Sequence, residues 1–174
     1  MLRPLAFIIA LLTSLLSVTW GAEPPSIEVC FTPGEDCTGL IVRLVNEAKQ
    51  EILVHAYSFT SAPIAKALVQ AHRQGVAVTV ILDRSQRGDR YSEADFLAHM
   101  GIPTFIDRRH AVAHNKVMLI DRQIVLTGSF NFTRAAQEKN AENLLVVKGD
   151  QKLVQRYQGN FEVHQRHAER YEGR

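Results

Sequence analysis

Hydrophobic and polar positions along the chain follow two alternating periods, which predicts a succession of strands and helices. Residues 76–83 form a continuous apolar run typical of a buried strand, whereas 61–75 repeats apolar residues at helical spacing between a serine cap and a glycine stop. Residues 114–129 predict two strands joined by a tight turn. The expected strands are 26–32, 51–59, 76–83, 102–107, the two within 114–129, and 141–149, and the expected helices are 38–50, 61–75, 92–101 and 150–172.

This order of elements predicts the α/β class. Strand and helix alternate from 27 to 107, and a hairpin, one more strand and a last helix follow. We expect a mixed, mostly parallel β-sheet flanked by helices on both faces. The chain has 174 residues, of which 46% are hydrophobic, and it shows no internal repeat or linker. Residues 22–174 are therefore predicted to form a single domain.

Residues 1–21 are predicted to be a secretory signal peptide. Arg3 precedes an apolar stretch from Leu5 to Val18, and the small residues Gly21 and Ala22 follow it. The stretch is shorter than the roughly 20 residues that a membrane-spanning helix needs, although an uncleaved anchor is the alternative. Cleavage would leave a domain exported across the inner membrane into the periplasm, without stable membrane insertion.

The two cysteines fit an oxidising compartment. Cys30 and Cys37 both follow the predicted signal, and the segment between them carries a Pro-Gly turn that can bring them together. We expect a disulfide between them, with two free buried thiols as the alternative.

Net charge says little about partners, because the formal value is only +2. Arginines are nevertheless concentrated in predicted loops, where local positive patches can hold phosphate groups even in a chain of modest charge. The alternative is that each of them is a solvated loop residue with a compensating aspartate. These arginines are Arg84, Arg87, Arg90, Arg108 and Arg109.

Four polar residues flank the predicted hairpin and are expected to meet. Residues two apart on a strand share a face, so His114 projects with Lys116, and Ser129 with Asn131. Because a hairpin returns the chain beside its start, all four converge near one sheet edge. A compact positive charge, two oriented donors and a nucleophilic nitrogen suit a tetrahedral anion. We therefore predict a phosphodiester site in which Lys116, Ser129 and Asn131 bind the phosphate.

Asp121 has a different expected role. It lies an odd number of residues from His114 and sits where the chain turns, so it should support the hairpin rather than contact substrate. No metal ion is expected at this site, because Lys116 beside His114 would repel a cation. No cofactor is expected either.

These residues match a known family. The spacing H-x-K-x4-D-x6-G-S-x-N is the signature of the phospholipase D superfamily, which the chain therefore resembles. A signal peptide, the segments 56–68 and 127–145, and a single motif copy resemble the secreted bacterial endonucleases of that superfamily. The resemblance implies a phospholipase D-like α/β/α sandwich, with Asp121 and Gly128 supporting the motif. The motif positions are His114, Lys116, Asp121, Gly128, Ser129 and Asn131.

The resemblance also implies a mechanism and a partner. Enzymes of this family use one motif histidine as a nucleophile, which forms a phosphohistidine, and a second as a general acid. Because this chain has one motif, two subunits would each supply His114 across a two-fold axis, as a homodimer. Glu142 matches the family's acidic residue that hydrogen-bonds a motif histidine. The catalytic residues implied are His114, Lys116, Asn131 and Glu142.

The histidines outside the motif receive other interpretations. His55 lies in a buried strand. His164 and His167 are one helical turn apart, a spacing more typical of a helix surface than of metal ligands. His110 lies in the loop before the motif, from which it could contact substrate.

Three functions compete for this site. The first is a nonspecific endonuclease, favoured by the resemblance and by the loop arginines. The second is a phospholipase D that hydrolyses phospholipid headgroups, although no long amphipathic segment beyond the last helix indicates lipid docking. The third is a catalytically silent nucleic-acid-binding module, which would have little need of His114, Lys116, Asn131 and Glu142 together.

Overall fold

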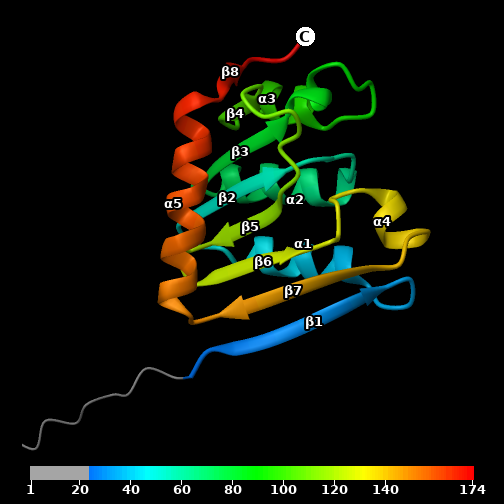
Figure 1. Ribbon diagram of the computed structural model, residues 1–174, viewed down its shortest axis with the longest axis vertical. Helices are drawn as coiled ribbons and strands as arrows, with labels where there is room; N and C mark the ends of the chain where they lie inside the picture. The colour runs from blue at the N-terminus through cyan, green and yellow to red at the C-terminus, as the bar shows by residue number, and fades with distance from the viewer. Residues whose placement is uncertain (1–23) are drawn as a thin grey trace, which may run out of the picture.

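The computed structural model describes residues 24–174, so the predicted signal peptide lies outside the described residues. These residues form one eight-stranded sheet covered by helices (Figure 1). The elements are β1 (Ser26–Thr32), α1 (Cys37–Glu47), β2 (Glu51–Ala56), α2 (Ala62–Arg73), β3 (Ala77–Asp83), the 3₁₀ turn η1 (Arg84–Arg87), α3 (Ala94–His99), β4 (Thr104–Asp107), β5 (Lys116–Ile120), β6 (Ile124–Gly128), α4 (Arg134–Glu138), β7 (Glu142–Lys148), α5 (Gln151–His167) and β8 (Glu169–Tyr171).

The strand order is β1-β7-β6-β5-β2-β3-β4-β8. The predicted α/β class, with a mixed sheet, is confirmed, but the expectation of a mostly parallel sheet is wrong. Only β2–β3 and β3–β4 are parallel, and the other five pairs are antiparallel. The reason lies in the connections. Helices α2 and α3 return the chain to the starting edge between parallel strands, whereas β5, β6 and β7 each reverse direction.

Each face of the sheet buries its own apolar core. Strand β2 shows the alternation, because Ile52 and Val54 belong to the core beneath α1 and α2. Leu53 points the other way, into a smaller core with Phe161 of α5. Helix α5 accordingly crosses the face opposite α1 and α2 (Figure 1). Consecutive residues at the end of β2 therefore reach two different environments.

The disulfide between Cys30 and Cys37 is present, with the two Cα atoms 5.7 Å apart. It joins β1 to the first residue of α1. Helix α1 then begins with an N-cap, since the Asp36 carboxylate accepts a hydrogen bond from the Gly39 N–H at 2.8 Å. The disulfide and the N-cap together fix the edge strand β1 to helix α1.

The last predicted helix is shorter than expected. Helix α5 ends at His167, and Glu169–Tyr171 form strand β8 instead, which pairs antiparallel with β4. The prediction of helix through 172 is therefore wrong for this segment. The backbone of β8 forms hydrogen bonds with the outer edge of β4. This long-range pairing overrides the local helical pattern.

Candidate active site

The motif begins at the sheet edge where the parallel strands end. Lys116 opens β5 and pairs in register with Ala56, the last residue of β2. Continuing the β5–β6 register, in which Met118 faces Leu126, sets Gly128 opposite Lys116. Strands β3 and β4 end at the same edge, because both run parallel to β2. Ligand sites of open α/β sheets commonly lie at this edge.

His114 and Lys116 lie side by side, as their spacing predicts. The Lys116 Nζ is 3.1 Å from the His114 Nδ1 and donates a hydrogen bond to the His114 carbonyl oxygen at 3.0 Å. Lys116 is only 8% exposed, and burial lowers its pKa, while the Glu142 carboxylate raises it. His114, by contrast, is exposed. The pair therefore offers a buried cation beside an accessible imidazole.

Tyr57 contacts both motif residues, a role that nothing in the residue pattern assigns to it. Its ring centroid lies 4.4 Å from that of His114 and 5.0 Å from the Lys116 Nζ. Its backbone N–H donates to the Asn115 carbonyl oxygen at 2.7 Å. The aromatic face stabilises the lysine cation and restricts the imidazole. The sequence feature that could have pointed to Tyr57 is its position directly after β2, inside the segment 56–68 that resembles the family.

Asp83 fixes the chain just ahead of His114. One oxygen of its buried carboxylate accepts the Ala113 N–H at 2.7 Å, and the other accepts the Ser85 N–H at 2.9 Å. A carboxylate that joins two segments in this way restrains the residue that follows. Asp83 lies thirty residues before Ala113, so local spacing gives no hint of this contact.

Gly128 and Ser129 secure the end of β6 against β7. Gly128 has a φ of 148°, and a Cβ there would collide with the Asn143 carbonyl oxygen. The Ser129 hydroxyl accepts hydrogen bonds from the Asn143 backbone N–H at 3.0 Å and from its side-chain amide at 3.3 Å. This hydroxyl is thus held by β7, and its proton is free to point toward an anion.

Asn131 and Glu142 are the two remaining residues of the predicted site. The Asn131 Oδ1 is buried and has no hydrogen-bond partner among the described residues. The Glu142 carboxylate accepts a hydrogen bond from the Asn140 amide at 3.0 Å, and within the described residues it makes none to His114. Glu142 is nevertheless close enough to Lys116 to raise its pKa. Both side chains therefore retain unused hydrogen-bonding capacity.

Asp121 lies in the turn of the hairpin, away from His114. Its carboxylate accepts hydrogen bonds from the backbone N–H groups of Lys49, Gln50 and Glu51 at 2.7–3.0 Å. Asp121 has a positive φ of 53°, which aspartate tolerates better than most residues. The three bonds also end α1 at Glu47, short of the predicted helix to 50. Asp121 thus anchors the hairpin to the start of β2.

Three of the five loop arginines gather at the same sheet edge. Arg84, Arg87 and Arg108 line a surface pocket beside the ends of β3 and β4. Arg87 and Arg108 both pair with Glu169 at 3.3 Å, so the single negative charge of one carboxylate is shared between two of the three guanidinium groups. Arg90 instead lies over the ring of its neighbour Tyr91. The pocket keeps a net positive charge.

His55 and His164 lie on the opposite face of the sheet, which α5 covers. Burial, with a smaller contribution from His164, lowers the pKa of His55 to about 4, so its ring is neutral at pH 7. The His55 Nε2 lies 3.4 Å from the side-chain amide of Asn115, the residue between His114 and Lys116. The surface interpretation of His164 and His167 is wrong, since their side chains are only 13% and 15% exposed. Together with His110 they surround Asp107.

No helix among residues 24–174 is long and apolar enough to cross a membrane.

Comparisons with known proteins agree on one family. Residues 41–165 match the family described as cardiolipin synthase, PLD-like domain. A protein of Rickettsia conorii named phospholipase D is 40% identical over 135 residues, which are 78% of this chain and 67% of that protein.

Two solved structures share the fold over nearly their whole length. Nuc from Salmonella typhimurium, described as a phospholipase D family member, has a TM-score of 0.81 and 35% identity, and the match covers 85% of this chain and 99% of Nuc. NucT from Helicobacter pylori has a TM-score of 0.79 and 21% identity, and the match covers 85% of this chain and 100% of NucT.

Proposed function

The chain belongs to the phospholipase D superfamily, on its Nuc-like branch, and on that premise we propose that it is a metal-independent phosphodiesterase that hydrolyses nucleic acid. The observation that carries the choice of substrate is the arginine pocket at the edge of the sheet where the motif begins. A local positive patch of this kind suits a polyanionic backbone. The resemblance to secreted bacterial endonucleases points to the same substrate.

The proposed reaction proceeds in two displacement steps. A His114 ring nitrogen attacks phosphorus, the bond from phosphorus to the leaving oxygen breaks, and a second imidazolium protonates that oxygen. The second imidazole then takes a proton from water, which attacks the phosphohistidine and releases His114. Lys116 offsets the charge on the phosphoryl oxygens throughout, with Ser129 and Asn131 as hydrogen-bond donors. The buried Asn131 Oδ1 has no hydrogen-bond partner among the described residues, and the NH₂ group of the same amide is proposed as the donor to the phosphate.

The second imidazole is proposed to come from another copy of the chain. Within the described residues, His114 is the histidine that contacts Lys116, and it is exposed rather than enclosed. Val112 beside it is 51% exposed, a large apolar side chain at the rim of the site. A two-fold axis near His114 would cover Val112, exclude water and supply the partner subunit's His114 as the acid. The homodimer therefore completes a half-site.

Glu142 gains a role in this arrangement. It makes no hydrogen bond to the His114 of its own chain, so its free oxygen is available to the partner subunit's His114. A carboxylate on one ring nitrogen fixes the tautomer and makes the other nitrogen more basic. Glu142 is thus proposed to orient the histidine across the axis.

Phospholipid hydrolysis is the second candidate. It is favoured by the name of the Rickettsia conorii relative and by the exposed Val112 beside His114, which could contact acyl chains. Both substrates present the same phosphodiester to Lys116. The two substrates differ in what surrounds the phosphodiester. In nucleic acid it is flanked by further phosphates that arginines can bind, and in phospholipid by an apolar interface.

Parallel cleavage assays are expected to separate these functions. The purified chain, shown to be folded in EDTA by circular dichroism, is incubated with plasmid DNA, single-stranded RNA and phosphatidylcholine vesicles. Degradation of nucleic acid in EDTA without lipid turnover is the expected result, because Lys116 rather than a metal offsets the phosphate charge. Lipid hydrolysis with intact nucleic acid would assign the chain to the phospholipase branch. Binding of DNA without any turnover would indicate the silent module.

We also propose that the domain acts in the periplasm after removal of residues 1–21. The Cys30–Cys37 disulfide supports an oxidising compartment. Fractionation of cells that express the full chain should recover the shortened protein by osmotic shock. A full-length product in the membrane fraction would instead identify an uncleaved anchor.

A further inference from the structure

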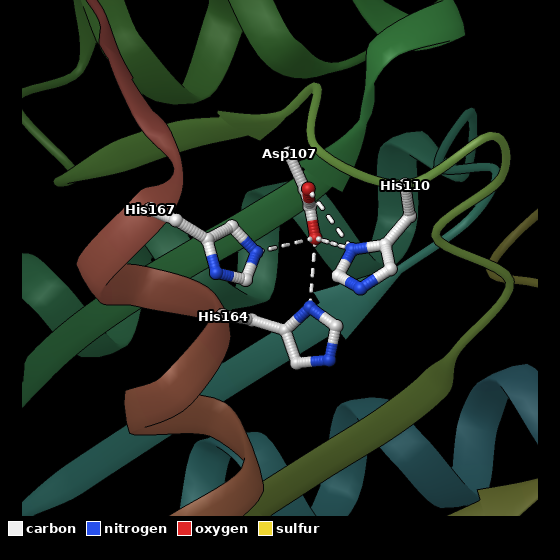
Figure 2. Close-up of side chains that lie close together, drawn as sticks. All are labelled: Asp107, His110, His164 and His167. Atoms are coloured by element: carbon white, nitrogen blue, oxygen red, sulfur yellow. Dashed lines mark hydrogen bonds and ion pairs between the residues drawn. The ribbon is translucent and has the colours of Figure 1, made fainter.

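A cluster of three histidines and one aspartate lies outside the proposed phosphodiester site. Asp107, at the end of β4, is fully buried, and one oxygen of its carboxylate faces all three rings (Figure 2). The Asp107 Oδ2 lies 2.7 Å from the His164 Nδ1, 3.1 Å from the His110 Nδ1 and 3.3 Å from the His167 Nε2. The four candidate ligand atoms all lie within 4.8 Å of one another.

Hydrogen bonding alone accounts poorly for this geometry. A carboxylate oxygen has two lone pairs, yet three ring nitrogens approach this single atom. One anionic oxygen and three imidazole nitrogens that converge on a common point are a ligand set for a cation.

We propose that Asp107, His110, His164 and His167 bind one zinc ion. Zinc prefers four ligands in a tetrahedron, and a bond of about 2.0 Å to each gives ligand atoms roughly 3.3 Å apart. Two of the three distances from the Asp107 Oδ2, 3.1 Å to His110 and 3.3 Å to His167, match this spacing. The distance to His164, 2.7 Å, is shorter, and this ring would move outward by a few tenths of an ångström to admit the ion. Three imidazoles exclude calcium and magnesium, which take oxygen ligands.

The neighbours of the cluster fit a metal site as well. The second Asp107 oxygen accepts the Arg109 backbone N–H at 3.0 Å, which fixes the carboxylate and leaves Oδ2 to face the rings. His164 and His167 are three residues apart, so both project from one side of the last turn of α5. His110 comes from the loop that leads to His114. Zinc would therefore join the end of β4, this loop and the end of α5.

The site is distinct from the phosphodiester site. The ring of His55 packs 4.5 Å from that of His164, on the face covered by α5. Lys116 alternates with Val117 and shares its face with Met118, which packs beneath α1 and α2. Strand alternation thus sets His55, against which His164 packs, and Lys116 on opposite faces of the sheet. The zinc ion is therefore a structural clamp on the loop rather than a phosphate-binding cation. This departs from the expectation that His164 and His167 are helix-surface residues rather than metal ligands.

Metal binding tests the proposal without any substrate, so its outcome is independent of the proposed function. Purified protein stripped with a chelator is titrated with Zn²⁺ by calorimetry and with Co²⁺ by absorption spectroscopy. We expect one ion per chain, a Kd for zinc below about 1 µM, and the visible absorption bands of tetrahedral cobalt. The melting temperature should rise on addition of zinc, because the ion binds only the folded chain.

Two variants and a matched control locate the ligands. His164→Gln and His110→Ala should each weaken zinc affinity by at least about 100-fold. The His110 side chain is 45% exposed in a loop, so its loss leaves the fold intact even if the His164 variant fails to fold. His99→Ala, which removes an exposed histidine outside the cluster, should bind zinc like the unmodified chain. Absence of saturable binding at micromolar zinc, or unchanged binding by the His110 variant, would overturn the proposal.

Discussion

Replacing His114 with alanine is expected to lower kcat by roughly 10⁴-fold or more, because the variant loses both the nucleophile and the general acid of the shared site. His114 is exposed and its ring makes few contacts with the core, so the melting temperature should stay close to that of the unmodified chain. Cleavage kinetics on DNA and thermal unfolding measure the two effects. His99→Ala, at an exposed position of α3 outside the motif, is the matched control and should keep full activity.

The same variant tests whether one site needs two subunits. When equal amounts of unmodified and His114→Ala chains are refolded together, random pairing leaves about one quarter of the dimers with both histidines. The mixture should therefore retain about one quarter of the activity of the same mass of unmodified protein. Retention of one half would mean that each chain works alone, which would contradict the shared site.

The local parts of the site were predictable because they depend on strand periodicity. His114 and Lys116 share a face through their spacing of two, and a hairpin needs only a turn at Asp121 to bring Gly128 opposite Lys116. The contacts that the residue pattern missed are long-range. Asp83 reaches Ala113 from a different strand, and no local period announces that meeting.

The zinc ligands illustrate the same limit. His164 and His167 carry a visible spacing of three, but Asp107 lies 57 residues before His164. Only the packing of α5 across β4 brings them together, and α5 could have met any strand of the sheet on periodicity alone. The parallel or antiparallel sense of a strand is equally hidden, because it depends on where each connection crosses the sheet. The expected mostly parallel sheet failed for that reason.

Replacing Lys116 with methionine is expected to reduce kcat/KM by about 10³-fold, since it removes the cation that faces the phosphoryl oxygens and keeps the apolar stem. The Nζ lies 3.1 Å from the His114 ring, so a phosphate attacked by that ring is also within reach of the ammonium. Cleavage kinetics measure the loss. Lys152→Met, on the exposed surface of α5, is the matched control and should leave kcat/KM unchanged.

The Lys116→Met substitution should not lower the thermal stability of the chain, although it lowers the activity. Burial lowers the pKa of Lys116 despite the nearby Glu142, so the folded chain holds this proton less tightly than the unfolded chain does. The charge therefore destabilises the folded state at pH 7, and the penalty is relieved only as the pH rises toward the pKa of the free side chain. The Lys116→Met variant should consequently melt at the same temperature as the unmodified chain or higher. A lower melting temperature would show that the ammonium serves mainly to hold the fold through Tyr57 and the His114 carbonyl. Activity within tenfold of the unmodified chain would show that Lys116 is not part of the phosphate site.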